Sequence, residues 1–233
     1  MTVTSILASS ALTTYAAAKS RINAQGGGGA QIVDDTHQNE VERLINAVSD
    51  AVVKYCGREF RKVSRVERHA PPDGERLVLD VTPVASTPAP TATIDSVAAT
   101  VEIEDANRGY LRCDAGWGGE DYKDTHAGAV TLSTKPGSAE RVVLVTYTGG
   151  YVTPSDEVAA SAGPPVVEAV LRTLPWDLEE AVIVAVSILW KWRLGGYAND
   201  VLPDRNTAIG RGMGGILPDV VLPMLDTYRR WDF

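Results

Sequence analysis

The residues in this sequence that could carry reactive chemistry are its three histidines and two cysteines, and their spacing matches no known site. His37, His69 and His126 are far apart, and no HExxH pair or other ligand spacing joins them to each other or to a cysteine. Cys56 and Cys113 form neither a CxxC motif nor a disulfide framework, which fits a reducing site of synthesis. We therefore expect surface or structural histidines and, at Cys56, a small buried hydrophobe rather than a nucleophile.

Two glycine clusters and two acidic clusters could in principle bind phosphate or a metal, but each lacks the required order. Residues 26–29 and 210–215 have no preceding strand and no following Gly-Lys-Ser/Thr, which a phosphate-binding loop needs. The acids at 102–105 and 120–121 do not follow the calcium-loop order of acids, a central glycine and a closing glutamate. The sequence therefore predicts no catalytic residue, no metal site and no cofactor, and a protein that is not an enzyme.

Charge and hydropathy exclude two further classes. The formal net charge is -8, and residues 34–188 carry the acidic excess, whereas a tight non-specific nucleic-acid binder needs a basic body. The longest nearly uncharged apolar run, 181–190, is about half of the roughly 20 residues that cross a bilayer, so we expect no membrane span. With 233 residues, 44% of them hydrophobic, the chain is long enough to bury a proper core.

Two helices are expected before residue 60. Thr13 could cap a short alanine-rich helix that runs to Ile22. The second helix starts at residues 34–35, where Gln38 stands in capping-box spacing after Asp35, and its other acids, Glu42 among them, should face away from the core. Its apolar stripe consists of Val41, Leu44, Ile45, Val48, Val52 and Tyr55. Gly57 should end it, because glycine tolerates the left-handed backbone that follows a helix.

The pattern changes to period two between residues 63 and 152, with turn residues between the alternating runs. The predicted strands are 76–81, 94–103, 129–132 and 141–147. This pattern is typical of a small antiparallel β unit.

Helical periodicity returns around Pro165 and strengthens after Pro175, where Asp177 and Glu180 have the spacing of a capping box. Residues 178–194 are apolar on nearly all sides, which predicts a helix buried at the centre of the fold or of an interface. The loop 195–217 is long for a compact domain, and we expect it to order on a partner.

A final short helix should begin at Pro218, before an aromatic and basic tail. Its apolar side would consist of Val220, Val221, Leu225 and Tyr228. The predicted fold class is therefore α+β: mainly a helical bundle with an inserted small antiparallel β unit, a long loop, and a C-terminal helix and tail. The expected divisions are 1–62, 63–152 and 153–233.

The order of these segments resembles the head-tail connector (adaptor) proteins of tailed bacteriophages and gene transfer agents. The helix ending in residues 53–60 (VKYCGREF) and the following strand are similar to the family's, as are 82–84 (TPV) and 94–97 (IDSV). Residues 145–151 (VTYTGGY) match the family's Val-Thr-Tyr-x-Gly-Gly-Tyr stretch. The likeness continues through the last two helices, so it spans nearly the whole chain.

This resemblance implies a non-catalytic structural subunit that is made in the cytoplasm of a host bacterium and resides in the virion. Family members form a ring, commonly of twelve copies, that binds the portal protein above and a stopper or tail completion protein below. The ring prolongs the DNA channel, helps to retain the packaged genome, and docks the tail. DNA would pass through the lumen without specific binding, which an acidic body favours because carboxylates repel phosphates.

Two groups of residues are candidates for contacts in such an assembly. The partner-binding candidates, for the portal or a neighbouring subunit, are Tyr228, Arg229, Arg230, Trp231 and Phe233. The candidates in the inter-subunit loop are Tyr197, Arg205, Arg211 and Met213. Two other interpretations remain: a tail completion or stopper protein, and a ligand-binding module that uses the β unit as its platform.

Overall fold

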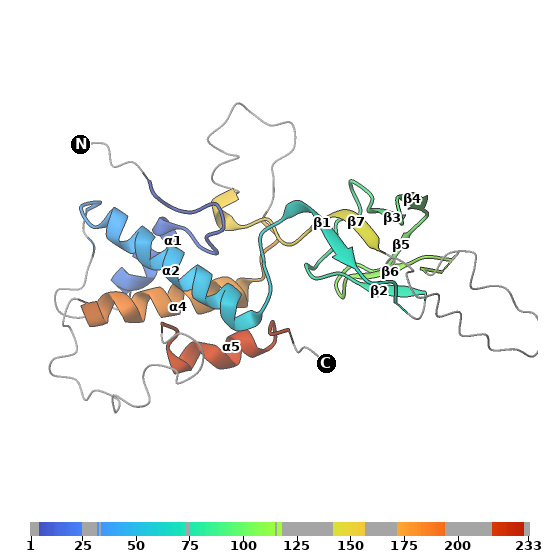
Figure 1. Ribbon diagram of the computed structural model, residues 1–233. Coiled ribbons are helices and arrows are strands. Elements are labelled where there is room, and N and C mark those ends of the chain that lie inside the picture. The colour runs from blue at the N-terminus through green and yellow to red at the C-terminus, as the bar shows by residue number, and fades with distance from the viewer. Residues whose placement is uncertain are drawn as a thin grey trace, which may run out of the picture. The chain divides into compact units, whose positions relative to one another are not determined.

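The chain forms two compact units in the computed structural model, residues 1–61 with 151–233 and residues 62–150 (Figure 1). The structure describes residues 5–24, 32, 34–72, 75–114, 116–117, 142–156, 172–193 and 216–230. Helices make up one unit and small antiparallel sheets the other, which confirms the predicted α+β class. The predicted strand 129–132 and the helical pattern around Pro165 lie outside the described residues.

The helical unit is built around two long helices that pack side by side, as Figure 1 shows. Its elements are α1 (Tyr15–Ala24), α2 (Gln38–Cys56), α4 (Trp176–Arg193), the 3-10 turn η2 (Asp219–Val221) and α5 (Leu222–Asp226). α1 and α5 also pack on α4, so all four helices share one apolar core.

The predicted stripe of α2 faces this core. Val41, Ile45, Val48 and Val52 are fully buried, at the steps of three and four that place residues on one side of a helix. The helix ends at Gly57, whose φ of +65° is the left-handed conformation expected there.

α4 is buried on most of its circumference, which confirms the prediction of a central helix. Its buried residues are Leu178, Glu179, Ala181, Val182, Ile183, Ala185, Val186, Ser187 and Trp190. An acidic first turn and a basic last turn oppose the partial charges of the helix ends.

The predicted cap of α1 is wrong by one residue. The Thr14 hydroxyl accepts the N–H of Ala17 at 3.3 Å and so caps the helix that begins at Tyr15. Thr13 instead is fully buried, and its hydroxyl donates to Glu179 at 3.0 Å. The carboxylate of Glu179 is buried and needs hydrogen-bond donors in place of water, and Thr13 supplies one.

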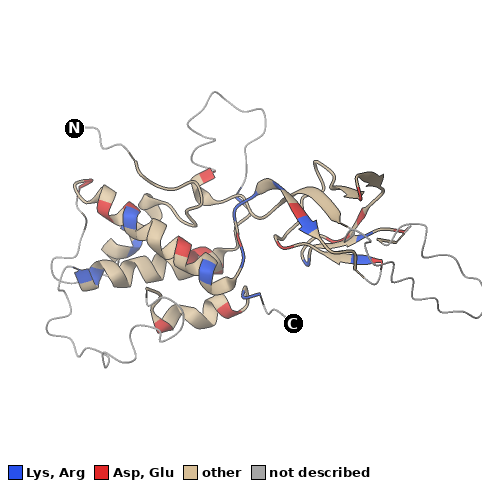
Figure 2. Ribbon diagram, in the orientation of Figure 1, with Lys and Arg blue, Asp and Glu red and all other residues tan. Residues whose placement is uncertain are grey.

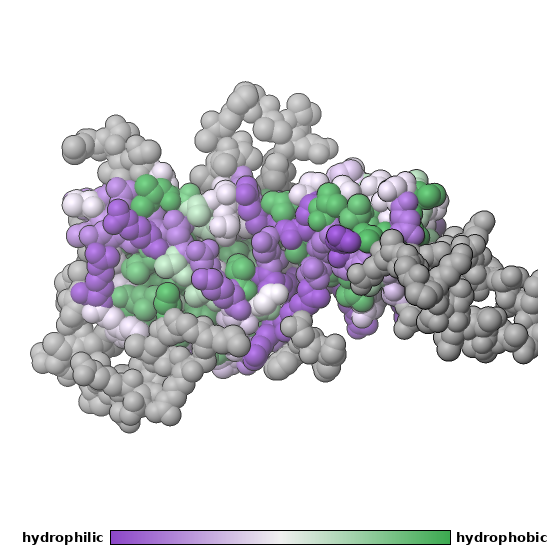
Figure 3. Space-filling model, viewed as in Figure 1, coloured by the Kyte–Doolittle hydropathy of each residue, from purple (hydrophilic) through white to green (hydrophobic). Residues whose placement is uncertain are grey.

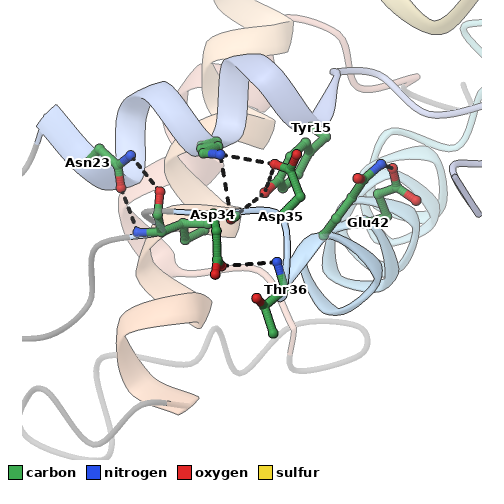
Figure 4. A network of polar contacts seen from close by, with 9 residues as sticks. Tyr15, Asn23, Asp34, Asp35, Thr36 and Glu42 are labelled. Carbon is green, nitrogen blue, oxygen red and sulfur yellow. Dashed lines mark hydrogen bonds and ion pairs between the residues drawn. The ribbon is translucent and has the colours of Figure 1, made fainter. Parts of the chain in front are cut away.

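The predicted capping box of α2 is also wrong. No side chain caps the helix at His37. The N–H of Gln38 donates to the backbone carbonyl of Asp35, at 3.0 Å, and not to its side chain. The carboxylate of Asp35 turns to α1, where it accepts hydrogen bonds from Lys19 at 3.0 Å and from Tyr15 at 3.3 Å (Figure 4). This network ties the start of α2 to α1.

The capping box expected at the start of α4 does not form either. Asp177 lies inside the helix and accepts the hydroxyl of Tyr228 at 2.6 Å and the N–H of Leu178 at 3.0 Å. Glu180 pairs instead with Arg21 of α1, at 3.2 Å. Contacts with distant segments thus take both side chains away from a local cap.

The β unit contains two antiparallel sheets. The first has the order β1 (Val63–His69), β7 (Val143–Gly149), β3 (Thr91–Ile94), β4 (Val97–Ala99), and the second the order β2 (Arg76–Val78), β6 (Tyr110–Arg112), β5 (Glu102–Asp105). Their shared core includes Leu77, Leu111, Trp117, Val143 and Val145.

The prediction of one strand over residues 94–103 is wrong. Asp95 and Ser96 take positive φ values of 48° and 71°, so the chain reverses and β3 pairs with β4 as a tight hairpin. The signal was weak in the sequence, because neither residue is glycine. The strand predicted at 76–81 is also shorter, since β2 ends at Val78.

Candidate functional site

The cysteines and histidines in the described part of the chain are buried or make structural contacts. Cys56 is fully buried in the helical core, and this burial raises the pKa of its thiol to about 12. A thiol with that pKa stays protonated near neutral pH, and Cys56 packs in the core as the predicted small buried hydrophobe. Among the described residues, no group of three or more His, Cys, Asp and Glu could hold a metal ion.

Two of the three histidines have structural contacts, as predicted. The ring of His37 lies edge-on to that of Trp190, with centroids 5.4 Å apart, at the start of α2. His69 contacts the Glu67 carboxylate at 3.1 Å. His126 lies outside the described residues.

Glu67 and Tyr147 form a half-buried polar link across the β unit. The Tyr147 hydroxyl donates to Glu67 and accepts the N–H of Val81 at 3.0 Å, while Glu67 also accepts the N–H of Asp80 at 3.0 Å. Burial alone would raise the pKa of Glu67, but the hydrogen bonds from His69, Asp80 and Tyr147 together lower it. These contacts fix the chain after β2 against β1 and β7, so the cluster holds the fold together.

The Gly-Gly-Tyr end of the resembling stretch 145–151 has a steric reason. A Cβ atom on Gly149 would lie 2.6 Å from the carbonyl oxygen of Val81 and 2.7 Å from Cε2 of Tyr147. Gly150 has a φ of +101°, which favours glycine. Close backbone packing thus explains the first glycine of the motif, and a positive φ explains the second.

The helical unit has a cleft of about 540 Å³ between the N-terminal segment, α1 and α2. Its three charged lining residues are bonded within the chain. Arg61 pairs with Asp156 at 2.9 Å and donates to Ser9 at 2.9 Å. Glu42 accepts hydrogen bonds from the N-terminal segment. This bonding indicates a structural cleft.

Residues 5–14 lie along α2 and are bonded to its polar side chains. The N–H groups of Ile6 and Ala8 donate to Glu42 at 2.6 Å and to Asn46 at 2.9 Å. The N–H of Leu12 donates to Ser49 at 3.1 Å. Glu42, Asn46 and Ser49 are spaced by four and three residues, so one face of α2 binds the whole segment.

Glu42 was expected to face away from the core, and that prediction is wrong. Only 1% of the residue is exposed, and its carboxylate accepts bonds from Ser5, Ile6 and Gln38. Periodicity identified the apolar face of α2 but could not show that a preceding segment, with backbone donors of its own, covers the adjacent polar face.

The C-terminal segment packs where α2 ends and α4 begins. Val221 and Leu225 are fully buried as predicted, but Val220 is 62% exposed, so the expectation that it shares their side is wrong: Val220 and Val221 are adjacent in the turn η2 and only Val221 is buried there. The Tyr55 hydroxyl donates to Asp226 at 2.5 Å. The thiol of Cys56 donates to the carbonyl of Leu225 at 3.8 Å.

The structure describes three of the five partner-binding candidates. Tyr228 contacts its own chain: its hydroxyl donates to Asp177, and its ring lies edge-on to Phe60 with centroids 6.2 Å apart. The Arg229 guanidinium lies 5.5 Å from the ring centroid of Tyr55. Arg230 donates its N–H to the carbonyl of Cys56 at 2.8 Å.

The other candidates lie outside the described residues. They are Trp231, Phe233, Tyr197, Arg205, Arg211 and Met213. Their roles stay predictions.

Trp176, at the first position of α4, is the exposed aromatic residue that sequence reasoning missed. It is 76% exposed, and the guanidinium of Arg172 lies 3.7 Å from its ring centroid. Arg172 is ion-paired to the buried carboxylate of Glu179, which also accepts the Thr13 hydroxyl. The sequence offered one signal for this residue: an aromatic side chain directly before the apolar run of the helix, outside the periodic pattern of that run.

A second exposed apolar surface lies on the sheet β1-β7-β3-β4. Register partners on antiparallel strands share a face, and Val66 is paired with Thr146, and Arg68 with Leu144. Val66 is 63% exposed and Leu144 40%. Figure 3 shows apolar residues at the surface of both units on the side in view. Exposed apolar residues next to one another are typical of contact surfaces.

Acidic and basic residues are interspersed along the described helices and strands (Figure 2). Among the described residues, no helix combines the length and apolar character needed to span a membrane.

Comparison with known proteins gives one informative likeness. No protein-family model matches the chain, and no curated protein matches it. A chain described as "Neck of empty GTA particle computed with C6 symmetry" is similar in structure, with a TM-score of 0.51, 15% identity, and coverage of 100% of this chain and 97% of that one.

A chain from "Virion of native gene transfer agent (GTA) particle" has a TM-score of 0.42 and 12% identity, with 100% and 96% of the two chains covered. That score is too low to support an argument. The first likeness extends over both units, and the chain therefore has a fold similar to that of a protein in the neck of a GTA particle.

Proposed function

We propose that this chain is a structural subunit of the head-tail neck of a tailed phage or gene transfer agent particle, and within the neck the connector that forms a ring beneath the portal. The observation that carries the proposal is the full-length fold likeness to a neck chain. The sequence resemblance to head-tail connectors supports it separately, because that resemblance rests on motif order and not on coordinates.

The ring would contain about twelve copies, as the resemblance implies, and would join the portal to a stopper or tail completion protein. Its role is mechanical: the ring extends the channel through which DNA leaves the head. The net charge of -8 supports this role, because an acidic wall repels phosphates and lets DNA slide. The subunit would be made in the host cytoplasm and remain in the virion.

The C-terminal tail is the proposed contact with the portal or a neighbouring subunit. Arg230 is tied by its backbone to the last turn of α2, so residues 231–233 continue from a fixed point on the helical unit. Trp231 and Phe233 would supply apolar contacts, and Arg229 and Arg230 would pair with acidic groups. Residues Tyr197, Arg205, Arg211 and Met213 would contact a neighbouring copy.

Images of particles produced without this chain test the proposal. A connector is required before the tail can attach, so we expect filled or leaking heads without tails. Free tails that carry the chain at their ends would place it on the tail side, as a tail completion protein or stopper. Particles with normal tails would contradict the proposal.

A further inference from the structure

The two exposed apolar surfaces described above differ in kind. The Trp176 patch, defined as Arg172, Trp176, Asp177 and Glu180, is a projecting ring with carboxylates beside it. The outer sheet face, defined as Ser64, Val66, Arg68, Thr91, Leu144 and Thr146, is a surface of β-branched and apolar side chains with one cation.

Trp176 is held rigidly, which is unusual for a side chain that is 76% exposed. Arg172 stacks on it at 3.7 Å from the ring centroid, and Glu179, only 3% exposed, fixes Arg172 by an ion pair. Thr13 donates to the same carboxylate at 3.0 Å. A large aromatic ring that loses little conformational freedom on binding is typical of the residues that dominate protein interfaces.

The outer sheet face is also rigid, since its residues alternate with the core residues of the same strands. β7 buries Val143 and Val145 completely and exposes Leu144 between them. Arg68 is the register partner of Leu144, so the two residues are neighbours on this face.

Charge at the two surfaces is complementary. Asp177 directly follows Trp176 and is exposed, and its hydrogen bonds from Tyr228 and Leu178 both end on Oδ1. The second carboxylate oxygen can therefore accept from a cation across an interface, and Arg68 is the cation of the outer sheet face.

We infer that the Trp176 patch of one copy docks on the outer sheet face of the next copy, with Trp176 against Val66 and Leu144, and Asp177 near Arg68. The occupant is a second copy because one chain carries both halves of the match. Two different surfaces make a heterologous contact, which repeats from copy to copy and forms a ring where the rotation between copies closes. The ring closure rests on the proposed function, whereas the contact itself does not.

Oxidative cross-linking between two variants, each with one added cysteine, tests the contact. Glu180→Cys places a thiol one helical turn from Trp176 and leaves the indole side chain in place. Val66→Cys places a thiol on the outer sheet face. The native Cys56 and Cys113 are 0% and 1% exposed, so they contribute little background. Because oxidation traps transient pairs of copies as disulfides, the test also works if the protein is mostly monomeric.

Val97→Cys is the matched control. Val97 belongs to the same sheet and is 70% exposed. It is the register partner of Ile94, which packs against the core, so Val97 lies on the opposite face of the sheet from Val66. We expect the Glu180→Cys and Val66→Cys pair to give about tenfold more disulfide-linked dimer than Glu180→Cys with Val97→Cys, the range that one strong interface contact supplies.

Two substitutions then identify the contacts. Trp176→Ala in the Glu180→Cys chain should lower the yield about tenfold, and Arg68→Glu in the Val66→Cys chain about threefold. Circular dichroism first confirms that each variant is folded. Equal yields from Val66→Cys and Val97→Cys, or a yield that Trp176→Ala leaves unchanged, overturn the inference.

The outcome separates this contact from the neck proposal. Cross-linking as expected together with normally tailed particles in the absence of the chain would leave the contact standing and overturn the neck role. Tailless particles together with control-level cross-linking would support the neck role and overturn the contact. A loss of tail attachment in Trp176→Ala without cross-linking would assign the patch to another neck protein.

Discussion

The backbone N–H of Arg230 donates to the carbonyl of Cys56 at 2.8 Å, so the described part of the C-terminal segment is bonded to the last turn of α2. Gly57 directly follows, and a Cβ atom there would lie 3.8 Å from Cβ of Arg230. That distance is an ordinary van der Waals contact, so this position needs glycine for its φ of +65° and not for space.

Deletion of residues 231–233 should leave the helical unit folded and abolish attachment to portal rings. The described contacts of the segment end at Arg230, and the buried residues before it, Val221 and Leu225, are kept. We expect the midpoint of thermal unfolding to change by no more than about 2 °C, since the core contacts of the described residues are kept. A pull-down with portal rings measures attachment, and retention at the wild-type level would contradict the docking role of the tail.

Glu42→Ala should release the N-terminal segment. The N–H of Ile6 and the hydroxyl of Ser5 lose a buried charged acceptor, which should lower the free energy of unfolding by about 1–3 kcal/mol. Urea unfolding measures this loss, and amide hydrogen exchange at Ile6 should become faster.

Glu40→Ala is the control on the same helix. Its side chain is 40% exposed and pairs with Arg193 at 3.4 Å on the surface, so we expect a change of less than about 1 kcal/mol. Equal effects of the two substitutions would mean that Glu42 does not hold the segment.

Gly149→Ala should destabilise the β unit. The added methyl group would lie 2.6 Å from the Val81 carbonyl oxygen and 2.7 Å from the Tyr147 ring, and the backbone carbonyl cannot turn aside cheaply. The expected loss is about 2–4 kcal/mol in urea unfolding. Gly116→Ala is the comparison, because its φ is +75° but no heavy atom lies within 4 Å of the added Cβ. Backbone strain alone should cost Gly116→Ala only about 1 kcal/mol, and equal losses would refute the steric account.

Stability should fall in alkaline solution because Tyr147 and Tyr228 resist ionisation. Burial, first, and hydrogen bonds to Glu67 and Asp177, second, raise the pKa of both phenols. Their contribution is fully present below the unfolded-state pKa of about 10 and is lost as pH rises towards the folded-state pKa.

Urea unfolding at a series of pH values from about 9 upwards measures this loss. The double variant Tyr147→Phe and Tyr228→Phe is the control, and its unfolding free energy should fall less steeply with pH. A double variant with the slope of the wild-type protein would exclude these two phenols as the cause.

The sequence predicted the elements whose signal is local. Steps of three and four identified α2, and Gly57 marked its end, because the apolar stripe and the left-handed stop depend on neighbouring residues. The uniformly apolar run after Pro175 likewise identified α4 as central.

The errors arose where a distant segment decides what a side chain does. Asp35 and Asp177 have the residue type and spacing of helix caps, but Lys19 and Tyr228 bind their carboxylates. Glu42 has the pattern of an exposed acid, but the N-terminal segment buries it. Trp176 lies outside the periodic pattern of its helix, and its contact with Arg172 depends on the folded chain.

Electron microscopy of the purified chain mixed with isolated portal rings tests the central claim most directly. The proposal predicts an additional ring of this chain on the tail-facing side of the portal, coaxial with it and with an open central channel. Portal rings that stay bare under the same conditions, or the chain bound elsewhere on the portal without forming a ring, would contradict the assignment as a head-tail connector.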